Sequence, residues 1–65
     1  MKKAYIVVMD FCSGCIKTYE HDFPEGAQNE DVENWLEEKT DFKNDQCYYM
    51  WKWEPIEIIE GDVND

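Results

Sequence analysis

The stretch YIVVM, residues 5–9, decides the fold of this 65-residue chain. Five apolar residues in a row, rich in β-branched side chains, are typical of a strand that is buried on both faces. In a small sheet, burial on both faces is easiest for a strand that has a neighbour on each side. We therefore expect residues 5–9 to form the central strand of a sheet.

A hairpin is predicted to follow this strand. The Ser-Gly pair at positions 13 and 14 is a two-residue turn signal, and residues 16–23 are predicted to return as the second strand. Counting back from such a turn places Asp10 opposite Lys17. A cross-strand pair of opposite charges favours this register.

A helix is predicted after the break at Pro24. Asn29 is a suitable N-cap, and acidic residues in the first turn suit the helix dipole. Apolar residues then recur with helical spacing to about residue 39 or 42, so the helix should bury one stripe. This stripe holds Val32, Trp35, Leu36 and Lys39, while Glu30, Glu33, Glu37 and Glu38 are expected to face away.

Residues 47–53, CYYMWKW, have the composition of a third strand, which Pro55 ends or kinks. A right-handed crossover places this strand most easily beside the first. The result is an α+β fold, a single ββαβ domain with an antiparallel or mixed sheet in the order 2-1-3. Residues 56–59 are a candidate for a short fourth strand. The domain would then span residues 1–60, followed by a flexible acidic tail at residues 61–65.

This architecture leaves one face of the sheet without cover, because a single helix covers only one face. We expect Tyr49, Trp51 and Trp53 to pack under the helix, and Tyr48 and Met50 to project from the other face. That face needs the C-terminal segment, a second copy of the chain or a partner to cover it.

Charge restricts the function. Sixteen acidic residues against six basic ones give a net charge of −10, which has the wrong sign for direct binding to nucleic acid or to an anionic membrane. The apolar run at residues 4–9 is too short for a signal peptide or a membrane span. With three cysteines, an odd number, the chain is predicted to be a reduced, cytoplasmic protein without a cofactor.

The motif Cys12-x-x-Cys15 is the stretch that most resembles a metal or redox site. A zinc site would add Cys47 and His21. However, His21 lies six residues along the strand from Cys15, roughly 20 Å away. A redox pair needs a stabilised thiolate, which the negative charge of nearby Asp10 disfavours. We interpret the two cysteines as small residues at a hairpin tip, and a zinc or redox module remains an alternative.

An enzyme is not expected. His21 is the only histidine, and its neighbours Glu20 and Asp22 should point to the opposite face of the strand. The chain has no glycine-rich phosphate loop and no triad pattern. So short a chain also has little room for a substrate pocket.

The remaining hypothesis is a binding protein. Aromatic residues and methionine are enriched at interfaces, and carboxylates along a helix approach the charge density of duplex DNA. A compact, very acidic and aromatic-rich chain resembles, in general character, the small inhibitors that phages encode against nucleic-acid enzymes. We therefore predict a DNA-mimic-like protein that inhibits or modulates a basic, nucleic-acid-binding partner. Its predicted binding residues are Glu30, Glu33, Glu37, Glu38, Tyr48, Met50, Trp51 and Trp53.

A second hypothesis is self-association. The uncovered face of the sheet would then be the interface of a homodimer, because an exposed apolar face of this kind is buried by a partner in stable proteins.

Overall fold

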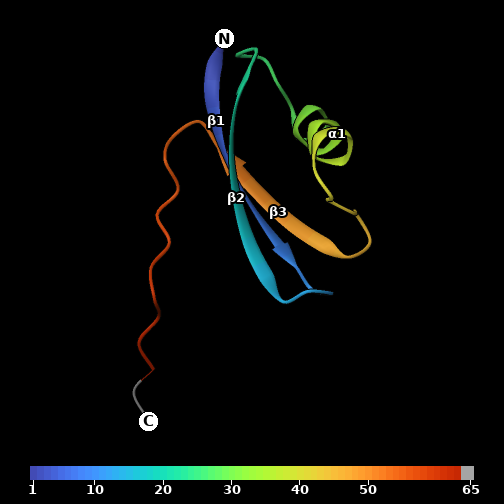
Figure 1. Ribbon diagram of the computed structural model, residues 1–65. Coiled ribbons are helices and arrows are strands. Elements are labelled where there is room, and N and C mark those ends of the chain that lie inside the picture. The colour runs from blue at the N-terminus through green and yellow to red at the C-terminus, as the bar shows by residue number, and fades with distance from the viewer. Residues whose placement is uncertain (64–65) are drawn as a thin grey trace.

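The computed structural model describes residues 1–63 and contains a three-stranded sheet and one helix. Strand β1 spans Lys2–Asp10, β2 spans Cys15–Phe23, α1 spans Asn29–Lys39 and β3 spans Cys47–Lys52. Strand β1 lies between β2 and β3 and is antiparallel to both (Figure 1). The predicted ββαβ fold with strand order 2-1-3 is confirmed, and the sheet is antiparallel throughout.

The hairpin between β1 and β2 has a longer loop than predicted. Four residues, 11–14, connect the strands, so Asp10 lies opposite Cys15 and Lys17 lies opposite Val8. The predicted pairing of Asp10 with Lys17 is therefore wrong by two residues. Because strand side chains alternate with a period of two, this shift leaves every side chain on its predicted face.

Asp10 and Gly14 build the longer loop. The Asp10 carboxylate accepts hydrogen bonds from the backbone N–H groups of Cys12 and Ser13, at 2.9 and 3.2 Å. Gly14 has a φ of 72° and donates its N–H to the Asp10 carbonyl at 2.9 Å, a conformation that glycine adopts without steric cost. Asp10 is thus engaged within the loop and is not available to a lysine across the hairpin.

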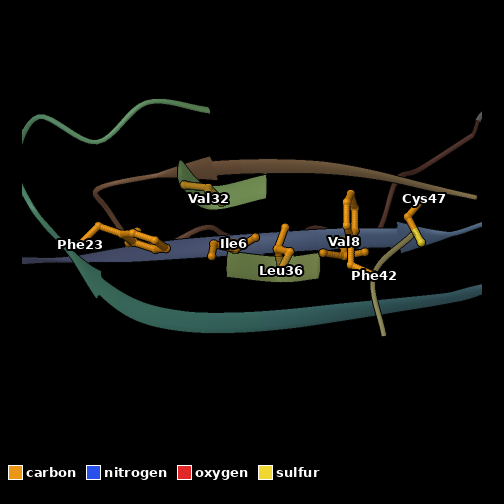
Figure 2. Packing of buried hydrophobic residues seen from close by; sticks show 8 residues of the cluster. Ile6, Val8, Phe23, Val32, Leu36, Phe42 and Cys47 are labelled. Atoms are coloured by element: carbon orange, nitrogen blue, oxygen red, sulfur yellow. The ribbon is translucent and has the colours of Figure 1, made fainter. Parts of the chain in front are cut away.

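The core lies between α1 and one face of the sheet (Figure 2). Alternate residues of β1 supply its floor, with Ala4, Ile6 and Val8 only 0%, 1% and 2% exposed. Val32 and Leu36 of α1 are fully buried above them. The surrounding residues are Phe23, Phe42, Cys47, Tyr19, Trp35, Tyr49, Trp51 and Trp53. The predicted packing of the odd-numbered face of β3 under the helix is confirmed.

The helix begins one residue earlier than predicted. Gln28 is the N-cap, and its backbone N–H donates a hydrogen bond to the Asp31 carboxylate at 2.8 Å. Asn29, which the sequence favours as the cap, is instead the first helical residue. Its side-chain oxygen accepts a hydrogen bond from the indole N–H of Trp51 at 2.8 Å. Asn29 therefore fastens the start of α1 to β3.

The other face of the sheet carries no helix or strand within residues 1–63. On this face Tyr5 and Val7 of β1 are half-buried, and Met9 is 44% exposed. The prediction that residues 5–9 are buried on both faces is therefore wrong. Only an irregular segment lies on this side, and it excludes less water than a packed layer would.

That segment is the C-terminal one. Residues 54–63 form neither strand nor helix, so the fourth strand predicted at residues 56–59 is wrong. Pro55 lacks a backbone N–H for a ladder, and the segment runs along the side of the sheet opposite α1 (Figure 1). In the predicted tail, residues 61–63 are exposed, and residues 64–65 lie outside the described residues.

Candidate functional site

The uncovered face of the sheet carries an apolar surface at its hairpin end. The register places Met9 between Ile16 of β2 and Tyr48 of β3. Phe11 packs edge-on against Tyr48, with ring centroids 5.0 Å apart. We define the open-face patch as Met9, Phe11, Ile16, Tyr48 and Met50, which are 44%, 62%, 60%, 65% and 54% exposed. Five large apolar side chains are therefore accessible together, as at protein interfaces.

Sequence reasoning found Tyr48 and Met50 but missed the other members of the open-face patch. Met9 and Ile16 face each other across the hairpin, so counting the strand alternation from Tyr48 through β1 to β2 would have placed them on the same face. Phe11 lies in the loop, where no alternation applies. Its position could not be read from the sequence.

The same face becomes polar and charged toward the start of β1. The next row across the sheet holds Thr18, Val7 and Met50, and the row after it holds Glu20, Tyr5 and Lys52. Glu20 and Lys52 thus flank the central strand from opposite sides. A hollow of about 470 Å³ lies between this part of the face and residues 55–58.

The acidic residues of α1 lie on the helix side of the sheet, across the molecule from the open-face patch. Glu30, Glu37 and Glu38 are exposed. Glu33 does not face away as predicted. It is half-buried, and the Tyr49 phenol donates a hydrogen bond to its carboxylate at 3.5 Å. The predicted partner-binding residues are therefore divided between two faces of the molecule.

Trp51 and Trp53 belong to the helix side of the sheet. Both are half-buried, and their rings meet edge-on with centroids 4.9 Å apart. A shallow hollow of about 390 Å³ beside β3 is lined by Asn29, Tyr49, Met50 and Trp51. Trp51 thus contacts the start of α1, and Trp53 packs against Trp51 on the same side of the sheet.

Tyr49 is held in its protonated form. Burial raises the pKa of Tyr49 above its ordinary value of 10.0, and the nearby Glu33 carboxylate raises it further, because a second negative charge beside the first is disfavoured. The single phenol proton is shared between the Glu33 carboxylate and the backbone carbonyl of Asn29, whose oxygen lies 3.3 Å from the Tyr49 oxygen. Protonated Tyr49 therefore links β3 to the first turns of α1.

Alkaline titration tests this link. We expect one phenol to ionise above the ordinary tyrosine range, and we expect Tyr49→Phe to remove that late step from the near-ultraviolet absorbance. Since the folded-state pKa is the higher one, the stabilisation is complete below about pH 10 and is lost as the pH rises through the folded pKa. Glu33→Gln should move the late step to lower pH. A late step that persists in Tyr49→Phe would contradict the assignment.

The three cysteines lie at the hairpin end of the molecule. Cys15 and Cys47 are the two cross-strand neighbours of Asp10, and Cys12 is in the loop. All three carry free thiols, and the Cys15 sulfur lies 2.8 Å from the Ser13 hydroxyl. Within residues 1–63, no group of three or more His, Cys, Asp and Glu side chains is placed to hold a metal ion.

His21 lies toward the other end of β2, opposite Ala4. It is an exposed residue, but its ring has a structural role: it stacks on Trp35 at 4.6 Å and meets Phe23 edge-on at 4.9 Å between centroids. Trp35 also contacts Tyr19 edge-on at 6.1 Å. We call these four residues the β2–helix aromatic cluster. Sequence reasoning missed it because the rotation of α1 about its axis decides which β2 residues Trp35 meets.

The lysines are too few to neutralise the acidic surface. Lys17 forms an ion pair with Asp41 at 2.7 Å, and this hydrogen bond lowers the pKa of the Asp41 carboxyl. Lys39 lies 3.8 Å from Glu38, the residue before it, and Lys52 lies 3.7 Å from Glu54, two residues after it. With sixteen acids and six bases, ten negative charges would remain even if every lysine were paired.

No helix among residues 1–63 is both long enough and apolar enough to cross a membrane. Comparison with protein families, with curated proteins and with solved structures finds no match for this chain. Its function is therefore inferred from its own residues.

Proposed function

We propose that this protein is a small, acidic, non-catalytic binding protein that inhibits or modulates a basic, nucleic-acid-binding protein in the cytoplasm by imitating the charge of duplex DNA. The observation that carries this proposal is the net charge of −10 together with the exposure of Glu30, Glu37 and Glu38 on one helix. A field of this sign accelerates association with a basic partner and opposes contact with nucleic acid itself.

The spacing of the acids supports the mimicry. Helix α1 has eleven residues and spans about 16 Å at about 1.5 Å per residue. It carries four exposed acids, Glu30, Asp31, Glu37 and Glu38, which is about one charge per 4 Å of axis. One strand of duplex DNA presents a charge about every 3.4 Å. A groove that fits a DNA strand would therefore meet a similar charge density.

Aromatic side chains beside these acids supply apolar contact. Trp51 is half-buried and donates a hydrogen bond to Asn29 at the start of α1, and half-buried Trp53 packs edge-on against it. Tryptophan contributes strongly to binding where water is excluded. The odd number of cysteines, three, favours a reducing compartment. In this proposal the glutamates steer and pair with the partner, and the tryptophans anchor it.

Capture from a cell lysate tests the proposal when it is combined with DNA competition. Proteins that bind the immobilised chain through a nucleic-acid site should be released by added duplex DNA and by salt, because both compete with charge pairing. Replacing Glu30, Glu37 and Glu38 together with glutamine should reduce the DNA-releasable fraction roughly tenfold or more. Glu33 stays unchanged because it contacts Tyr49.

A matched control distinguishes the effect of the helix glutamates on capture from the effect of net charge alone. Glutamine at Glu25, Glu57 and Glu60, which are exposed residues outside the helix, removes the same three charges and should leave capture nearly unchanged. If the two triple variants lose the same amount of DNA-releasable capture, net charge alone explains the binding. That result would refute a site specific to the helix. Captured proteins that duplex DNA fails to release would refute the mimicry.

A further inference from the structure

The open-face patch is large enough to form much of a protein interface. Its five side chains are 44–65% exposed, and at roughly 200 Å² each they present on the order of 500–600 Å² of apolar surface. This is the upper end of the size of the largest apolar patch on a typical monomer, about 300–600 Å², and patches of that size are often functional. A standard interface buries about 800 Å² on each partner. The patch would supply most of that area, and the polar residues at its rim would supply the remainder.

The charges at the rim of the patch on one copy complement those at the rim of the patch on a second copy. Glu20 on β2 and Lys52 on β3 both lie beside Tyr5, in the same row across the sheet. Two such faces can be related by a two-fold axis that runs along β1 in the plane between them, which places β2 of one copy over β3 of the other. Glu20 of each copy then lies opposite Lys52 of the other.

The same axis also matches the apolar rows. Ile16 of one copy lies opposite Tyr48 of the other, because both share the row of Met9. Met9 itself belongs to the central strand, so it meets its own counterpart on the axis. Two sheets packed face to face lie about 10 Å apart, a distance that side chains of this length fill from both sides.

We propose that the uncovered face of the sheet is a dimerisation surface, that its occupant is a second copy of the chain, and that the two-fold axis runs along β1. The proposal goes beyond the proposed function and does not rest on it. In the dimer the two helices lie on the outer sides, so the glutamates of α1 stay exposed in both copies.

A two-fold axis across the strands is a worse solution. It would place the charged row of Glu20 and Lys52 over the apolar row of Ile16 and Tyr48, and charges buried against apolar groups without a partner are unfavourable. With the axis along β1, Lys3 meets its own counterpart. This contact lies at the rim, and Lys3 has Asp22 beside it in its own sheet.

The C-terminal segment must move aside for the second copy. Residues 55–58 enclose a hollow with the sheet, of about 470 Å³, where a packed layer would leave no such space. Ile58 and Ile59 of this segment are 63% and 74% exposed. Ile56 is half-buried beside the sheet, so displacement of the segment loses mainly the contacts of Ile56 and exposes Tyr5 and Val7 for the interface.

Sedimentation analysis of charge-reversed variants tests the proposal. The wild-type chain should show a reversible monomer–dimer equilibrium. Glu20→Lys alone and Lys52→Glu alone should each weaken dimerisation about tenfold, because each creates two like-charge contacts. An equimolar mixture of the two variants should form a heterodimer at least as tightly as the wild type, because both cross-interface pairs are then of opposite charge.

A matched mixture controls for net charge. Glu25→Lys and Lys43→Glu change the charge by the same amounts at exposed positions outside this face, and neither the single variants nor their mixture should differ from the wild type in dimerisation. Met9→Asp places two carboxylates on the axis and should give a monomer whose circular dichroism spectrum is unchanged. A chain ending at residue 54 should dimerise as tightly as the wild type or more tightly.

Three results would overturn the inference: a monomer at all concentrations, a mixture of Glu20→Lys and Lys52→Glu that fails to associate, or loss of the dimer on truncation. None of these three results bears on the proposal that the chain captures a basic partner. Salt distinguishes the two interactions as well, because it screens the repulsion between two acidic chains and releases a basic partner. The dimer should therefore persist at salt concentrations that abolish capture.

Discussion

Replacing Leu36 with alanine is expected to lower the free energy of unfolding by about 2–5 kcal/mol. Leu36 is fully buried in the middle of the core, above β1, so its removal loses the transfer free energy of the side chain and leaves a cavity. A domain of this length has a total stability of about 3–10 kcal/mol. The variant should therefore lose roughly half of the stability of the domain.

Urea unfolding followed by far-ultraviolet circular dichroism measures the effect of Leu36→Ala. The control is Glu37→Ala, the next residue along the helix, which is exposed and should change the free energy by less than about 0.5 kcal/mol. Protein concentration must be equal in all samples, because dimerisation would add to the apparent stability. A loss below about 1 kcal/mol for Leu36→Ala would mean that the helix does not pack on the sheet as described.

Replacing Trp35 with alanine is expected to cost about 3 kcal/mol, the low end for a large aromatic residue because Trp35 is half-buried. Trp35 lies at the centre of the β2–helix aromatic cluster, within 4.6–6.1 Å of three aromatic rings of β2. Strand β2 has a strand neighbour on one side only. Pairing with β1 and the ring contacts with Trp35 therefore together hold the far half of β2 in place.

The matched control for Trp35→Ala is Tyr48→Ala, which also removes an aromatic ring but from a 65% exposed position. It should cost no more than about 1 kcal/mol. A double-mutant cycle between Trp35 and His21 should give a coupling of about 0.5–1.5 kcal/mol for the stacked pair. Equal costs for Trp35→Ala and Tyr48→Ala, or zero coupling to His21, would contradict the role of the cluster.

The topology could be predicted because local pattern and global fold agree. Alternation along β1 places Ala4, Ile6 and Val8 in the core, and helical spacing places Val32 and Leu36 opposite them. The expectation that residues 5–9 are buried on both faces was wrong. An apolar run indicates a strand, but it does not indicate which segments of the protein pack on each face of that strand. The same residues that suggest a buried strand here form a half-exposed face.

The hairpin register could not be predicted from the Ser-Gly signal. The Asp10 carboxylate accepts backbone hydrogen bonds inside the loop, and this local satisfaction competes with a cross-strand pair to Lys17. Lys17 instead reaches Asp41, which follows the helix. The preference between these two partners depends on tertiary structure, which short-range rules do not contain.

The candidate site was predicted in its residue types but not in its arrangement. Strand alternation separates Tyr48 and Met50 from Trp51 and Trp53, and the structure keeps this separation. The placement of Glu33 was wrong, because the indole of Trp51 and the phenol of Tyr49 draw the start of α1 onto β3. Buried polar tips of aromatic residues need partners, and that requirement fixes how the helix is turned.

The loop at residues 11–14 has a consequence for protein engineering. Pairs such as Ile6 with Tyr19, which face the core, hold the two strands in register, so the tip that joins them is free to change in length. A foreign epitope grafted between Ser13 and Gly14 would be displayed beyond the end of the sheet. The molecule could thus display an inserted peptide without a change in the packing of its core.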